Sequence, residues 1–167
     1  KRAILTKSKW LGEYPYNIVS VVDGGNGGGM EYPTITLLDD GGSEKMLDFV
    51  INHEVGHNWF QAILGSQERT HPWMDEGMNS YYDDKYKNQQ YGENPKLERL
   101  LFETQAIEKL DQPIKTSSEK FNVINYGLVA YYKSAEWMRY LELQLGMELF
   151  NRALQEYYRR WQFKHPQ

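Results

Sequence analysis

The stretch His53-Glu54-Val55-Gly56-His57 decides how the rest of this chain is interpreted. In a helix, residues at positions i and i+4 lie on one face, roughly 5–6 Å apart. The two histidines can therefore share one metal ion. Glu54 is turned by about 100° from the first histidine, so its carboxylate flanks the metal and does not bind it. A carboxylate in that place can take a proton from a metal-activated water, which is the arrangement of a catalytic zinc site.

The sequence around this stretch favours a helix. From Met46 to Leu64 apolar residues recur at intervals of three and four, as an amphipathic helix requires. Ser43 is a plausible N-cap and Gly65 a plausible C-terminal stop. The pattern thus predicts one helix over residues 43–64. The alternative, two surface or core histidines on a long helix, would leave the acidic Glu54 beside an apolar face without a reason.

A third ligand is available in the segment Trp73-Met74-Asp75-Glu76-Gly77. Eighteen residues separate His57 from Glu76, enough to finish one helix, cross a loop and begin the next. Three protein ligands leave the fourth position of a tetrahedral zinc to water, which distinguishes a catalytic site from a closed structural one. We therefore expect one Zn²⁺ per chain, held by His53, His57 and Glu76.

These motifs resemble the gluzincin metallopeptidases, and within them the aminopeptidases of family M1. Three further stretches support the narrower resemblance, which covers the chain from about residue 10 to its end. Residues 28–33, Gly-Gly-Met-Glu-Tyr-Pro, are similar to the G-x-M-E-N exopeptidase motif, and residues 131–134, Tyr-Tyr-Lys-Ser, are similar to the family's Y-x-K-G segment. Residues 14–16, Tyr-Pro-Tyr, match the Y-P-Y that comes before the exopeptidase motif. The chain departs from the family at Tyr32-Pro33, where asparagine usually follows the glutamate, and at Ser134, where glycine is more frequent.

The resemblance implies a thermolysin-like α+β fold that is predominantly helical. We expect a single catalytic domain over residues 1–167, with a β region at 1–42 and a helical zinc-binding part at 43–167. M1 enzymes are several times longer, so the chain is expected to be part of a larger protein with further N- and C-terminal domains. The residue patterns predict strands at 17–22 and 34–38, and helices after the first at 73–91, 94–110, 127–145 and 147–163.

The resemblance also implies roles for the residues around the metal. Glu54 would be the general base, and Tyr131 would donate to the oxyanion of the tetrahedral intermediate. Tyr126 would line the cleft. Asp83 would accept the second N–H of a ligating histidine. The alternative for Asp83 is a solvated pair with Asp84.

The exopeptidase motif would hold the substrate. Gly28, Gly29 and Met30 would pair with the substrate backbone as an added strand. Glu31 would bind the free α-ammonium group of a peptide, against the alternative of a solvated loop carboxylate. A phosphate cradle in the glycine run 24–29 is disfavoured, because it lacks the lysine of a P-loop and the spacing of a dinucleotide motif.

Composition narrows the classes of function. The formal net charge of −4 argues against a nucleic-acid partner, and no apolar run is long enough to span a membrane. The absence of cysteine excludes thiolate ligands, and the compartment stays open. The expected activity is an aminopeptidase acting on peptides with a free N-terminus. The alternatives are a thermolysin-type endopeptidase, an epoxide hydrolase related to the family, and a zinc-bearing domain that serves only as a scaffold.

Overall fold

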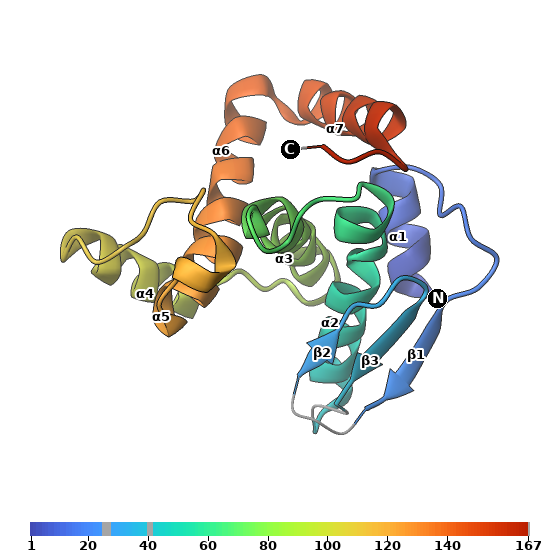
Figure 1. The fold of residues 1–167 in the computed structure, drawn as a ribbon, viewed down its shortest axis with the longest axis horizontal. Coiled ribbons are helices and arrows are strands. Elements are labelled where there is room, and N and C mark those ends of the chain that lie inside the picture. Colours follow the sequence, from blue (N-terminus) through green and yellow to red (C-terminus); the bar gives the residue numbers. More distant parts are fainter. Residues whose placement is uncertain (25–27, 40–41, 167) are drawn as a thin grey trace. The chain divides into compact units, whose positions relative to one another are not determined.

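The computed structural model describes residues 1–24, 28–39 and 42–166 (Figure 1). The central part of the glycine run, residues 25–27, lies outside the described residues. The chain divides into two compact units. We call Lys1–Gly65 with Asn151–Pro166 the sheet unit, and Ser66–Phe150 the helical unit.

The sheet unit contains a three-stranded sheet in the order β1-β3-β2. β1 (Ser20–Asp23) runs parallel to β3 (Ile35–Leu38), and β2 (Gly29–Met30) pairs antiparallel with β3, with Met30 opposite Leu37. The two predicted strands are thus present with shifted bounds. β2 was not predicted as a strand; among the described residues it forms one edge of the sheet.

Two helices of the sheet unit pack together, and one of them lies against the sheet (Figure 1). α2 (Glu44–Gly56) begins at the predicted N-cap, where the Ser43 hydroxyl accepts a hydrogen bond from the Met46 N–H at 3.2 Å. α1 (Arg2–Trp10) was not predicted, because the fully buried Lys7 interrupts the apolar spacing between Ala3 and Leu11. The region that precedes the sheet therefore begins with a helix.

The helix predicted over 43–64 is not continuous. α2 ends at Gly56, and the following helical segment η1 (Asn58–Ile63) is broken at Phe60 (ψ 92°) and Gln61 (φ 121°). Beyond His57 the backbone conformation depends on tertiary contacts, which the periodicity of apolar residues cannot predict. The Trp59 indole N–H donates to the Gly12 carbonyl at 2.9 Å, and the Trp59 side chain is fully buried.

The helical unit is built from segments that join end to end. Its elements, with bounds, are η2 (Trp73–Gly77), α3 (Met78–Tyr91), α4 (Lys96–Ile107), η3 (Ser118–Lys120), α5 (Val123–Asn125), η4 (Tyr126–Lys133) and α6 (Ser134–Leu145). α7 (Met147–Trp161) begins in this unit and continues into the sheet unit. No helix among the described residues is long and apolar enough to cross a membrane.

Glycines follow two of these helices, whose ends at Tyr91 and Leu145 agree with the predicted bounds. Gly92 (φ 66°) caps α3 and Gly146 (φ 77°) caps α6, both in backbone conformations that favour glycine. The core of the unit is apolar and aromatic, and its buried side chains include Met74, Met78, Tyr82, Val129, Ala130 and Met138. This packing holds η2 and α3 against η4 and α6.

Candidate active site

The histidine pair of the sheet unit has the spacing of two zinc ligands. On α2 and its C-terminal end, the Nε2 atoms of His53 and His57 lie 3.2 Å apart, with their rings nearly perpendicular at 89°. Two Zn–N bonds of about 2.0–2.1 Å at a tetrahedral angle would place the nitrogens about 3.3–3.4 Å apart. His57 is buried and His53 is partly exposed. Because the pair already has nearly this spacing, the residues present fit a zinc ion.

Glu54 lies between the two histidines in sequence and is packed against the edge strand of the sheet. Its side chain is 6% exposed. A Cβ added at Gly29 would overlap the Glu54 carboxylate, so a larger residue at this position would require the Glu54 side chain to move. The backbone of β2 and the Glu54 carboxylate are therefore immediate neighbours, which links the exopeptidase motif to the metal motif within one unit.

The exopeptidase motif lies at the exposed edge of the sheet. Gly28, Gly29 and Met30 are exposed, and Glu31 follows them with its side chain partly buried. An edge strand presents backbone N–H and C=O groups that an extended peptide can pair with. The position of β2 is thus compatible with an added strand of substrate backbone.

In the helical unit, Tyr131 hydrogen-bonds to the carboxylate of Glu76. Glu76 is 7% exposed, on η2, and Tyr131 belongs to η4. Burial first, and then the Glu76 charge, raise the pKa of the Tyr131 phenol well above its usual range. Tyr126 stands beside it, with ring centroids 5.7 Å apart. The structure therefore brings together three residues that the sequence singled out.

Both segments that carry these residues are wide helical turns. η2 continues directly into α3, and η4 continues directly into α6. Met78 and Ser134, the first residues after the two wide turns, both have right-handed helical backbone dihedrals. Helical turns of this width are rare in proteins overall, and many of those that occur lie at functional sites. Residue patterns did not predict them, because side-chain periodicity does not distinguish an extra residue in a turn.

Gly77 allows η2 to approach η4 and α6 closely. A Cβ at Gly77 would overlap Ser134 Cβ and would lie 2.8 Å from the Ala130 carbonyl oxygen. Both obstacles lie close to the backbone and cannot rotate away. The glycine that follows Glu76 is thus required for the close packing of η2 against η4 and α6.

We expect Gly77→Ala to destabilise the protein by about 1–3 kcal/mol, the usual cost of overpacking a core. Urea denaturation followed by circular dichroism measures the change. Gly127→Ala is the matched control, because a Cβ there has no atom within 4 Å and alanine favours helix. Equal stability of the two variants would contradict the close packing at Gly77.

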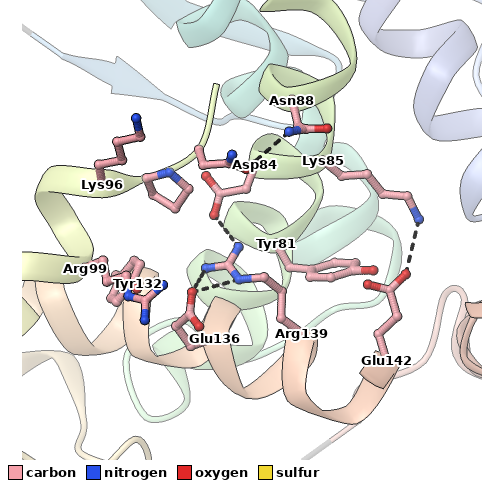
Figure 2. Close-up of a pocket in the computed structure, with 12 residues that line it drawn as sticks. Tyr81, Asp84, Lys85, Asn88, Lys96, Arg99, Tyr132, Glu136, Arg139 and Glu142 are labelled. Atoms are coloured by element: carbon pink, nitrogen blue, oxygen red, sulfur yellow. Dashed lines mark hydrogen bonds and ion pairs between the residues drawn. The ribbon is translucent and has the colours of Figure 1, made fainter. Parts of the chain in front are cut away.

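Asp83 and Asp84 do not form a solvated pair, and that alternative is wrong. Asp83 is 2% exposed. Asp84 binds Arg139, whose Nη1 lies 2.7 Å from Asp84 Oδ2 and which also pairs with Glu136 (Figure 2). Burial raises the pKa of Asp84, and Arg139 opposes this rise. Asp84 thus joins α3 to α6, and the role predicted for Asp83 at a histidine stays a prediction.

This ion-pair cluster borders a cavity of about 520 Å³ that is separate from Tyr131 and Glu76. Figure 2 shows Lys85 pointing toward Glu142, with Lys85 Nζ 3.9 Å from Glu142 Oε1. Tyr132 lies at the opposite side of the cavity. Neighbouring tyrosines of one segment therefore have different surroundings. Tyr132 packs at the cavity, whereas Tyr131 meets the Glu76 carboxylate.

Residues 7–167 match the family model described as the Peptidase family M1 domain. The chain belongs to peptidase family M1. Among its relatives, Aminopeptidase M1-B of Oryza sativa subsp. japonica is 25% identical over 136 residues, which are 77% of this chain and 16% of the relative. The chain therefore spans about a sixth of the length of this curated M1 relative.

Solved M1 structures share the fold of this chain. An M1 zinc metallopeptidase variant from Deinococcus radiodurans, bound to a Tyr-Ser-Ala substrate, aligns with a TM-score of 0.80 at 20% identity, covering 99% of this chain and 37% of that one. Native yeast LTA4 hydrolase aligns with a TM-score of 0.76 at 21% identity, covering 98% of this chain and 29% of that one. These likenesses confirm the predicted class, a predominantly helical, thermolysin-like α+β fold.

Proposed function

We propose that this M1 chain carries the zinc-binding part of an aminopeptidase, an enzyme that hydrolyses the N-terminal peptide bond of peptides. One observation carries the proposal. The His53 and His57 Nε2 atoms are 3.2 Å apart, on the same helix as a buried glutamate that touches the backbone of the exopeptidase motif. Family membership and the names of the relatives support the same activity.

We infer that His53, His57 and Glu76 hold one zinc ion. Zinc in proteins is bound mainly by cysteine thiolates, histidine imidazoles and carboxylates. The chain has no cysteine, so its zinc ligands would be imidazoles and a carboxylate, which together form a catalytic donor set. When bound, zinc supplies Lewis-acid polarisation of the scissile carbonyl and makes water acidic enough to react near neutral pH.

Two further side chains would act on the reacting atoms. Glu54 accepts a proton from the attacking water and passes it to the departing amine. Tyr131 donates its phenolic hydrogen to the developing oxyanion. The Tyr131 hydroxyl already donates toward an anionic oxygen in the structure, that of Glu76, which supports its assignment as a donor to negative charge.

The sheet edge would select the substrate. The backbone at Gly28, Gly29 and Met30 pairs with the extended peptide, and Glu31 binds the free α-ammonium group, which fixes cleavage at the first bond. Tyr126 lines the cleft and Asp83 orients a ligating histidine. Further domains of the parent protein complete the substrate site.

We expect the protein to cleave Tyr-Ser-Ala, the peptide bound by the Deinococcus radiodurans relative, at least about 100-fold better than its N-acetylated form. Glu31→Ala should lower kcat/KM for the free peptide by about 10- to 100-fold, because a hydrogen bond to a charged group contributes about 1.5–3 kcal/mol. Chromatographic assay of the released tyrosine measures both values.

The control is Glu13→Ala, which removes an exposed carboxylate from the same unit and should leave kcat/KM unchanged. Equal cleavage of free and acetylated peptides by the wild-type protein would contradict the aminopeptidase proposal and favour a thermolysin-type endopeptidase. Zinc binding without cleavage of either peptide would favour a scaffold role.

A further inference from the structure

Asn58, the residue after His57, is a buried hub of hydrogen bonds inside the sheet unit. Its side chain is 1% exposed. Its Nδ2 donates to the Val55 carbonyl at 3.0 Å, and its Oδ1 accepts the Thr34 backbone N–H at 2.9 Å. The Tyr14 hydroxyl, which is 3.0 Å from the Ile18 carbonyl, is also 3.4 Å from Oδ1. One side chain thus joins the histidine helix to two distant segments.

The contact with Thr34 reaches the turn that carries Glu31. This turn connects β2 to β3 and is closed by a hydrogen bond of 3.1 Å from the Ile35 N–H to the Tyr32 carbonyl. Thr34 itself has a φ of 64°, a backbone conformation that is uncommon for a residue with a branched side chain. The hydrogen bond from Asn58 therefore supports Thr34 in a left-handed backbone conformation that threonine rarely adopts.

The chemistry of the contact calls for an amide. Asn58 must accept from one backbone N–H and donate to one backbone carbonyl, while carrying no charge next to His57. Both backbone partners belong to segments with roles in the proposed site, since Val55 lies between Glu54 and His57 and Thr34 lies three residues after Glu31. Asn58 thereby connects the histidine pair to the ammonium-binding turn through two hydrogen bonds.

We propose that Asn58 is a positioning residue that sets the distance between Glu31 and the His53–His57 pair, and so fixes how the enzyme measures from the N-terminus of its substrate. This inference rests on the proposed function. We call the hydrogen bond from the Thr34 N–H to Asn58 Oδ1 the clamp. Asn58 acts through this bond and does not touch the substrate. A displacement near 1 Å in such a support can cost about 100-fold in rate.

The test compares Asn58→Ala with the wild-type protein on Tyr-Ser-Ala and acetyl-Tyr-Ser-Ala. We expect KM for the free peptide to rise about tenfold, the preference for the free N-terminus to fall by a similar factor, and zinc content to stay unchanged. In the Glu31→Ala background the same substitution should have little further effect, because both changes remove one function and interacting residues are not additive. Additive effects on KM, or an unchanged preference, would overturn the proposal.

Two variants separate positioning from general stability. Asn58→Asp keeps the oxygen that accepts the Thr34 N–H, but it loses the donor to Val55 and adds a charge next to His57. Its measured quantity is therefore hydrogen exchange at the Thr34 amide, which should stay within about threefold of the wild-type rate and which provides a test if Asn58→Ala fails to fold. A folded Asn58→Asp protein in which the Thr34 amide exchanges as fast as in Asn58→Ala would overturn the proposal. Tyr14→Phe removes the hydroxyl that also contacts Oδ1 and leaves the Thr34 contact, so the preference should persist.

Hydrogen exchange at the Thr34 amide, measured by NMR, tests the clamp independently of turnover. Exchange should accelerate at least tenfold in Asn58→Ala and stay near the wild-type rate in Tyr14→Phe. Failure of the proposed function would appear as a wild-type protein that does not prefer free N-termini. Failure of the clamp would appear as unchanged Thr34 exchange, or as a wild-type preference that survives Asn58→Ala.

Discussion

Replacing Glu54 with glutamine is expected to lower kcat by a factor of about 10²–10⁴, the usual contribution of general acid–base catalysis, with zinc content unchanged. Glutamine has the shape of glutamate, so the packing between this side chain and the backbone of Gly29 is preserved. It cannot accept the proton of the attacking water. Steady-state kinetics on Tyr-Ser-Ala and elemental mass spectrometry of the purified protein measure the two quantities.

Glu44→Gln is the matched control, because it makes the same chemical change in the first turn of the same helix, at an exposed position. It should leave kcat within about twofold. A Glu54→Gln protein that keeps more than a tenth of the wild-type kcat would show that another group takes the proton. A Glu54→Gln protein that loses its metal would instead make Glu54 part of the zinc-binding set.

The ends of the helices could be predicted because their signals are local. Ser43 satisfies a backbone donor three residues ahead, and Gly92 and Gly146 adopt backbone conformations that few other residues adopt without strain. The histidine pair is predictable for a similar reason. A spacing of four residues on a helix sets the separation of His53 and His57 whatever the rest of the chain does.

The interruptions of the helices could not be predicted, because they depend on distant residues. η1 is broken directly after Trp59, whose indole donates to the Gly12 carbonyl, and Gly77 at the end of η2 packs closely against Ser134. α1 was missed because Lys7 is buried at a position where periodicity calls for an apolar residue. In each case a contact between segments outweighs the local pattern.

The same distinction holds within the candidate site. The sequence could single out Tyr131 only through the resemblance to Y-x-K-G, since Tyr126 and Tyr132 are near in sequence. The structure gives each tyrosine its own surroundings, with Tyr131 at Glu76 and Tyr132 at the ion-pair cavity. Asn58 received no role from the sequence, although its position directly after His57 was a signal that could have drawn attention to it.

His53→Ala is expected to abolish zinc binding and, with it, detectable peptidase activity. Changes to groups that merely orient a ligand cost about 10- to 100-fold in metal affinity, so the loss of a ligand should cost more than 100-fold. Elemental mass spectrometry should find about one zinc per wild-type chain and none in the variant. Thermal unfolding gives a second measurement. Zinc at 100 times its dissociation constant should stabilise the wild-type protein by about 2.7 kcal/mol and leave the variant unaffected.

The control for His53 is His71→Ala, because His71 lies in the loop before Pro72 and does not belong to the proposed ligand set of His53, His57 and Glu76. This variant should keep its zinc and its zinc-dependent stability. Since the chain has four histidines and no cysteine, few other residues could replace a lost nitrogen ligand. Zinc that stays bound at the wild-type ratio in His53→Ala would therefore remove His53 from the ligand set. Zinc lost equally from His71→Ala would show that the metal depends on the fold in general and not on the spacing of His53 and His57.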